Sequence, residues 1–132
     1  MESEEHQKLL NGLARGLEKN GVEITHLDIS GTPEFFDEKY RDLPTPTERE
    51  DHVPDLEGMK DGLRHLGEAK IDINNDSNID SQLEVFANRE IDGKDIPLHI
   101  VIPKNLKEDL ETKLKELGLY DKYDNKLISI WS

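Results

Sequence analysis

Apolar residues recur at helical spacing near the start of the chain and again near its end. Between Ser3 and Asn20 the apolar positions fall on one stripe, which predicts an amphipathic helix. Ser3 can cap the start of this helix, and Asn20-Gly21 is a typical helix end. In residues 105–119 four leucines repeat in the same way, so this segment predicts a second amphipathic helix.

The remaining patterned segments predict five strands and one more helix. Their apolar residues alternate with polar ones or form short runs bounded by turn residues. The predicted strands are residues 22–29, 52–58, 63–73, 96–103 and 126–132. Residues 79–91 predict a helix that Asp80 or Ser81 starts. The resulting order of elements predicts an α/β (α+β) fold, in which a mixed β-sheet is flanked by helices.

Residues 30–52 form an insert between the first two predicted strands. Its first half, "TPEFFDEKYRDL", predicts a short helix with Pro33 at the first helical position. Phe35, Phe36 and Tyr40 have a helical spacing, and we expect them to pack the insert onto the core. The proline-containing second half predicts an exposed loop.

The composition limits the class of protein. A chain of 132 residues suits a single domain over 1–132, and the absence of cysteine excludes disulfides and thiolate metal sites. No apolar run approaches the roughly 20 residues that a membrane span requires. The acidic start has no signal-peptide core. We therefore expect a cytoplasmic protein that does not enter a membrane.

The formal net charge of −13 bears on possible partners. Strong negative charge repels phosphate backbones, and a nucleic-acid binder normally presents a basic face. Binding to nucleic acid by the chain alone should therefore be weak, and a local basic cleft or a protein partner would have to support it.

Acidic and basic residues meet in the predicted hairpin of residues 52–73. Alternation along a strand places Glu68 and Lys70 on one face, with Ala69 on the other. If the two strands pair through the turn at residues 59–62, Asp55 comes to lie beside Glu68. Two close carboxylates repel each other unless a cation holds them, and Mg²⁺ or Mn²⁺ suits such oxygen ligands. A surface Glu–Lys pair without function remains the alternative.

Pro54-Asp55 followed by Glu68-Ala69-Lys70 resembles the motif of the PD-(D/E)xK nuclease superfamily. This superfamily includes many restriction endonucleases and archaeal Holliday junction resolvases, and the resemblance extends over about residues 3–119. It implies a restriction-endonuclease-like fold and hydrolysis of nucleic-acid phosphodiesters, with DNA preferred to RNA as the substrate. Asp55 and Glu68 would then hold Mg²⁺ or Mn²⁺, and Lys70 would assist the attacking water.

The same resemblance implies two supporting residues. The family often has an acidic residue on its first helix, for which Glu5 is the candidate metal ligand. It also often has a polar residue on the helix after the lysine strand, and Gln82 fits that place. Many proteins of this fold form pairs, so a homodimer is expected as one possible assembly.

Two other functions remain open from the sequence. The first is a catalytically inactive nuclease fold that binds a protein partner through its acidic surface. The second is weak calcium binding through Asp72–Glu84, where acidic and amide side chains fall at ligand positions of a calcium loop. This loop has serine where the sixth position needs glycine, and leucine where the twelfth needs glutamate.

Overall fold

The structure is a computed structural model, and it describes residues 3–29, 33–46, 52–73, 79–88, 90–91 and 94–132. Its helices are α1 (Glu4–Lys19), α2 (Ile79–Ala87), α3 (Lys107–Glu116) and α4 (Tyr120–Asp124). Its strands are β1 (Glu23–Leu27), β2 (Leu56–Lys60), β3 (Leu63–Ala69), β4 (Glu90–Ile91), β5 (Lys94–Asp95), β6 (Leu98–Val101) and β7 (Ile128–Trp131). Short 3₁₀ turns are η1 (Pro33–Phe35), η2 (Glu38–Tyr40) and η3 (Lys104–Leu106).

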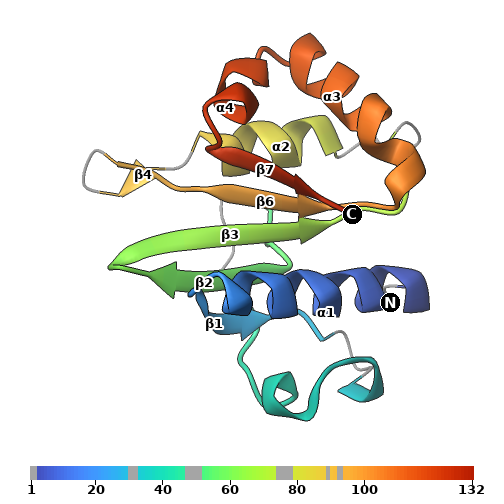
Figure 1. The fold of residues 1–132 in the computed structure, drawn as a ribbon, viewed down its shortest axis with the longest axis vertical. Coiled ribbons are helices and arrows are strands. Elements are labelled where there is room, and N and C mark those ends of the chain that lie inside the picture. Colours follow the sequence, from blue (N-terminus) through green and yellow to red (C-terminus); the bar gives the residue numbers. More distant parts are fainter. Residues whose placement is uncertain (1–2, 30–32, 47–51, 74–78, 89, 92–93) are drawn as a thin grey trace.

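Five of these strands form a mixed sheet in the order β1-β2-β3-β6-β7 (Figure 1). The first three make an antiparallel meander, whereas β3, β6 and β7 run parallel to one another. The strands β4 and β5 pair separately. The expected α/β (α+β) class with a mixed sheet between helices is therefore confirmed at this level.

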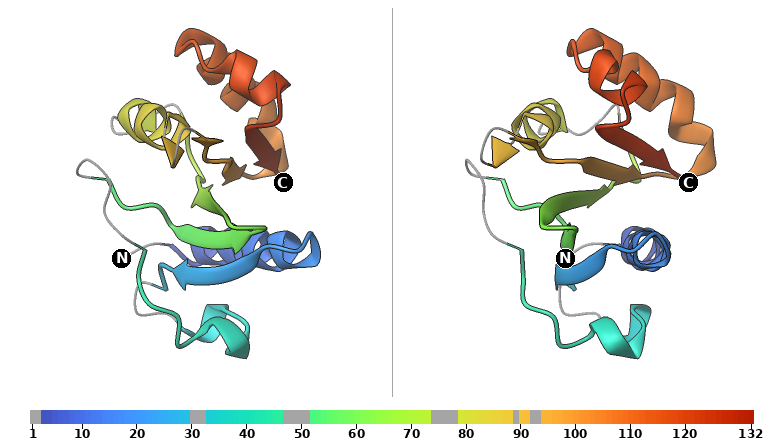
Figure 2. Two further views of the ribbon diagram at one scale, coloured as in Figure 1. Left: turned by 90° about the vertical axis from the view of Figure 1, so that its left-hand side faces the viewer. Right: turned by 60° about the vertical axis from the view of Figure 1, so that its left-hand side comes forward.

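Helices cover both faces of the sheet (Figure 2). The leucine stripe of α1 packs on one face, in a core that also contains Leu56, Ala69 and Val101. On the other face, α2 and α3 pack over β3, β6 and β7, in a core that contains Leu66, Leu98 and Ile100. Among the described helices, none is long and apolar enough to cross a membrane.

The predicted helix start and hairpin turn are confirmed. The Ser3 hydroxyl caps α1 by accepting a hydrogen bond from the backbone N–H of His6. The hairpin between β2 and β3 closes through Asp61 and Gly62, which both have positive φ (51° and 80°). A two-residue turn in which both residues have positive φ has a backbone twist that matches the twist of the two strands it joins.

The helix predicted for residues 79–91 is too long, because α2 ends at Ala87 and residues 90–91 form a strand. The Asn88 side chain donates to the backbone carbonyl of Glu84, which satisfies a carbonyl at the helix end and favours termination there. Helix α4 and strand β5 are not among the predicted elements.

The insert contains two short 3₁₀ turns in place of the single helix predicted for it. Asn11 of α1 explains this break, because its side chain accepts from the backbone N–H of Asp37 and donates to the Asp37 carboxylate. The expected packing of the insert is confirmed for Phe36 and Tyr40, which are buried against α1 and β1. Residues 30–32 and 47–51 of the insert lie outside the described residues.

A row of polar rings lies on the α1 face of the sheet. Trp131 Nε1 donates to His99 Nδ1 (3.2 Å), and His99 Nε2 lies 2.9 Å from His65 Nδ1, to which it can donate. Burial, and next the neighbouring His65, lower the pKa of His99 to about 4. His99 is therefore a buried histidine with a hydrogen-bond partner at each ring nitrogen.

We predict that His99 makes the fold less stable in acid. The unfolded chain protonates this histidine near its ordinary pKa of 6.5, and the folded chain only near 4, so stability falls as the pH drops through this window. The free energy of unfolding should fall by about 3 kcal/mol across this pH window. In His99→Gln this acid-induced fall should be absent, because glutamine cannot take up the proton. Urea unfolding at several pH values measures this, with His52→Gln as control. Equal acid sensitivity of His99→Gln and the unmodified protein would contradict the prediction.

Gly58 lets β1 and β2 approach closely. A Cβ atom at this position would lie 2.6 Å from Val22 Cγ1 and 2.9 Å from the backbone oxygen of Glu23. We predict that Gly58→Ala destabilises the protein by about 1–3 kcal/mol, because the strand backbone must move. Gly12→Ala is the matched control. It adds a methyl group in open space on α1 and should stabilise the helix by about 0.5–1 kcal/mol in denaturant unfolding.

Candidate functional site

Pairing of β2 and β3 brings Asp55 to Glu68. The backbone N–H of Asp55 donates to the Gly67 carbonyl (3.1 Å), and Leu56 pairs with Gly67 in the ladder. One position further along, Asp55 therefore lies opposite Glu68. The two side chains are 6% and 2% exposed, so they form a buried acidic pair and not a solvated surface.

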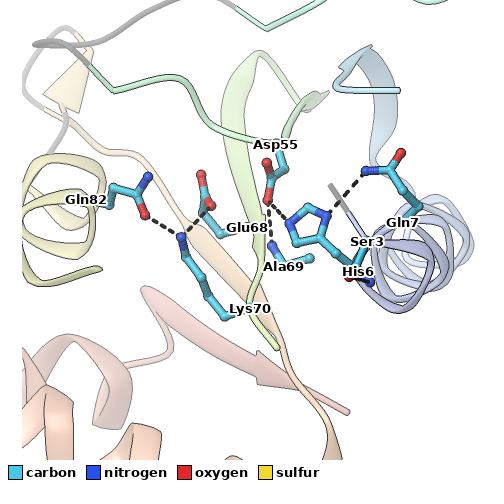
Figure 3. Close-up of polar contacts among 8 residues, drawn as sticks. All are labelled: Ser3, His6, Gln7, Asp55, Glu68, Ala69, Lys70 and Gln82. Carbon is cyan, nitrogen blue, oxygen red and sulfur yellow. Dashed lines mark hydrogen bonds and ion pairs between the residues drawn. The ribbon is translucent and has the colours of Figure 1, made fainter. Parts of the chain in front are cut away.

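Lys70 lies directly after the end of β3 and turns its ammonium toward Glu68. Its Nζ lies 3.6 Å from Glu68 Oε2 and donates a hydrogen bond to Gln82 Oε1 (Figure 3). Its side chain is only 11% exposed. The Glu68 carboxylate and the Gln82 amide therefore both help to hold the positive charge beside the acidic pair.

Gln82 comes from α2, whose packing explains its direction. The residues Ile79, Leu83 and Phe86 face the core, and Gln82 lies beside this stripe at the helix edge nearest Lys70. The supporting position predicted for Gln82 is thus occupied by a side chain that contacts the lysine.

The second carboxylate oxygen of Glu68 has an unusual environment. Glu68 Oε1 is buried and has no hydrogen-bond partner among the described residues. Burial, and next the charge of Asp55, raise the pKa of Glu68 well above its ordinary value, while Lys70 opposes this rise. The carboxyl groups of Asp55 and Glu68 can share a hydrogen bond only when one of them is protonated. When both are ionised, Glu68 Oε1 has no hydrogen-bond donor among the described residues. A buried acceptor without a donor is costly and calls for a further partner.

His6 of α1 approaches Asp55 from the opposite side. Its Nε2 lies 3.1 Å from Asp55 Oδ2, and the backbone N–H of Ala69 donates to the same oxygen (2.9 Å). His6 is 6% exposed and the adjacent Gln7 is fully buried. Figure 3 shows Asp55 between His6 and Glu68.

Glu5 does not join this group. It is exposed on α1, where it lines a separate surface pocket with Glu4, Lys8 and Leu9. The phase of the helix accounts for the difference, because positions 6 and 7 precede Leu10 by four and three residues and so continue its buried stripe. The leucine spacing of α1 places His6 on the buried stripe, whereas the acidic residue that the family resemblance implies pointed to Glu5.

The arrangement of donors limits which cation could bind. Within the described part of the chain, no group of three or more His, Asp or Glu side chains could hold a metal ion. Mg²⁺ needs only one or two carboxylates and keeps several waters, and Mn²⁺ also takes oxygen ligands. The unsatisfied Oε1 of Glu68 beside Asp55 fits such an ion, so Asp55 and Glu68 are suitable ligands.

A second polar group lies further along the same face of the hairpin. Glu57 is 1% exposed. Its Oε2 lies 3.4 Å from His26 Nδ1, and its Oε1 lies 3.6 Å from Arg64 Nη1. Arg64 and His26 therefore lie on the face of the sheet that carries the acidic pair.

Of the loop Asp72–Glu84, residues 74–78 lie outside the described residues, and these include most of the expected calcium ligands. His52 Nε2 lies 2.8 Å from the hydroxyl oxygen of Ser81 at the start of α2.

Comparison with known proteins adds no relatives. The chain matches no family model, no curated protein and no solved structure.

We predict that the Glu68 carboxyl titrates well above an ordinary glutamate, and that its neighbours shift it in opposite directions. Asp55→Asn should lower the pKa of Glu68, because a negative neighbour is removed. Lys70→Met should raise it further, because a positive neighbour is removed. Carbon-13 NMR of the side-chain carboxyl groups across a pH titration measures both shifts. Unchanged titration in both variants would mean that the three side chains do not interact.

Proposed function

We propose that this protein is a metal-dependent nuclease-like hydrolase of nucleic-acid phosphodiester bonds. One observation carries the proposal: Asp55 and Lys70 lie beside Glu68, which has one buried oxygen without a hydrogen-bond donor among the described residues. A structural ion pair would leave no such oxygen, whereas a site that receives a cation requires one.

The order of elements supports a restriction-endonuclease-like fold. The core of the PD-(D/E)xK superfamily is a helix, a three-stranded meander, a helix and further strands. Here α1 precedes the meander of β1, β2 and β3, and α2 then leads to β6, which pairs with β3. Asp55 directly precedes β2 and Glu68 lies on β3, which matches the order of the motif.

The residues of the site would divide the work as follows. Asp55 and Glu68 would bind Mg²⁺ or Mn²⁺, which would neutralise phosphate charge and lower the pKa of a coordinated water. Lys70 would stabilise the negative charge that develops on the phosphate, since its ammonium is already oriented by Glu68 and Gln82. Gln82 would act by holding Lys70 in place.

The charge of the chain predicts weak affinity for the substrate. Its net charge of −13 repels DNA or RNA, although Lys70, Arg64 and His26 lie on the face that carries the site. DNA is the preferred substrate class. A second copy of the chain or a basic protein partner would provide the affinity that the single chain lacks.

The same charge favours one second candidate. A catalytically inactive nuclease fold could use an acidic surface to bind a basic protein, since such surfaces steer association. In that case Asp55 and Glu68 would be what remains of an active site that no longer catalyses hydrolysis.

A cleavage assay tests the proposal. We expect Mg²⁺- or Mn²⁺-dependent cleavage of plasmid, single-stranded or branched DNA, or of RNA. Asp55→Asn, Glu68→Gln and Lys70→Met should each reduce the rate by at least about 100-fold, because each removes an interaction with the reacting phosphate or the metal.

The exposed ion pair of Glu4 and Lys8 on α1 provides matched controls. Glu4→Gln and Lys8→Met make the same chemical changes outside the site and should leave the rate unchanged. Cleavage that persists in all three site variants would come from a contaminant. No cleavage of any substrate by the folded protein would favour the inactive binding module.

A further inference from the structure

The two oxygens of Asp55 have different surroundings. Oδ2 accepts from the backbone N–H of Ala69 (2.9 Å) and lies 3.1 Å from His6 Nε2. A carboxylate oxygen has two lone pairs, so these two donors saturate Oδ2. Figure 3 draws both of these contacts on Oδ2 and none on Oδ1. In the view of Figure 3 this oxygen points away from His6.

The ring of His6 is itself held in place. Gln7 Nε2 lies 3.4 Å from His6 Nδ1, and the Ser3 hydroxyl accepts from the His6 backbone N–H (3.1 Å). If the Gln7 amide donates to Nδ1, the ring proton lies on Nε2, where it faces the aspartate. Because both residues are buried, the ring has little room to turn away.

Glu68 presents a matching arrangement. Its Oε2 faces the Lys70 ammonium (3.6 Å), and its Oε1 is the buried oxygen without a donor. Each carboxylate thus has one oxygen occupied by protein donors or charge and one oxygen left for another partner. Among the described residues, Oδ1 of Asp55 and Oε1 of Glu68 are therefore the oxygens of this pair best placed to bind a cation.

We propose that His6 is a positioning residue of the metal centre, which holds Asp55 so that the aspartate offers one oxygen to the ion. This inference rests on the proposed metal-dependent function. Single-oxygen binding by both carboxylates leaves the other coordination positions to water and substrate phosphate. A hydrogen-bonding partner behind a metal ligand typically contributes a factor of about 10–100 in metal affinity.

Mn²⁺ binding tests the role of His6 without any need for turnover. The free Mn²⁺ signal in electron paramagnetic resonance is titrated with each variant, and binding retained by Asp55→Asn defines the background of an acidic chain. His6→Phe keeps a ring and removes both nitrogens, so it should weaken the Asp55-dependent site by about tenfold or more. His6→Gln keeps a side-chain N–H donor at similar reach and should stay within about threefold of the unmodified protein.

Glu5→Gln is the control on the neighbouring exposed residue, and it should leave Mn²⁺ affinity unchanged. Circular dichroism and thermal unfolding establish that each variant is folded, and His6→Leu replaces His6→Phe if the latter is not. Unchanged affinity in His6→Phe, an increase in affinity, or an equal loss in His6→Phe and His6→Gln would overturn the positioning role.

Failure of the underlying function has a separate signature. If the unmodified protein and Asp55→Asn bind Mn²⁺ equally, the metal centre itself is absent, and the inference falls with it. If Asp55-dependent binding is present but the His6 variants do not change it, the metal centre stands and only the role of His6 is excluded.

Discussion

The backbone hydrogen bond from Asp55 to Gly67 is the contact on which the site depends. It extends the β2–β3 ladder by one position beyond the strand and sets Asp55 opposite Glu68. A shift of one residue in this register would move Glu68 to the α1 face and separate the carboxylates. The Asp61-Gly62 turn prevents this shift, because a two-residue turn with positive φ allows only one pairing of the strands it joins.

The acidic pair is a local cost to the fold. Two carboxylates that are both more than nine-tenths buried repel each other, and Lys70 offsets only part of that repulsion. A chain selected for stability alone would place apolar residues at these positions, as it does at Leu56 and Leu66 next to them. Conflicts of this kind are expected where a site needs charge more than the core needs packing.

Much of the fold could be predicted from residues that act locally. The Ser3 cap, the leucine stripe of α1 and the Asp-Gly turn depend on neighbours within a few positions, and all three appear as expected. The meeting of Asp55 and Glu68 followed from strand alternation and that turn. The end of α2 and the break in the insert could not be predicted in this way. The break depends on Asn11, which is 26 positions from Asp37 in the sequence. The order of β3, β6 and β7 depends likewise on contacts between distant segments.

The site draws on both layers of the molecule, because His6 belongs to α1 and Gln82 to α2, on opposite faces of the sheet. Residues 1–70 contain His6, Lys70 and both carboxylates of the acidic pair. The Gln82 amide, which orients Lys70, lies on the next helix, α2. That helix packs in the same core as β6. A chain that is still being synthesised, or whose second layer has locally opened, would carry the acidic pair without an oriented ammonium. Docking of α2 would then be the step that orients the Lys70 ammonium beside the acidic pair.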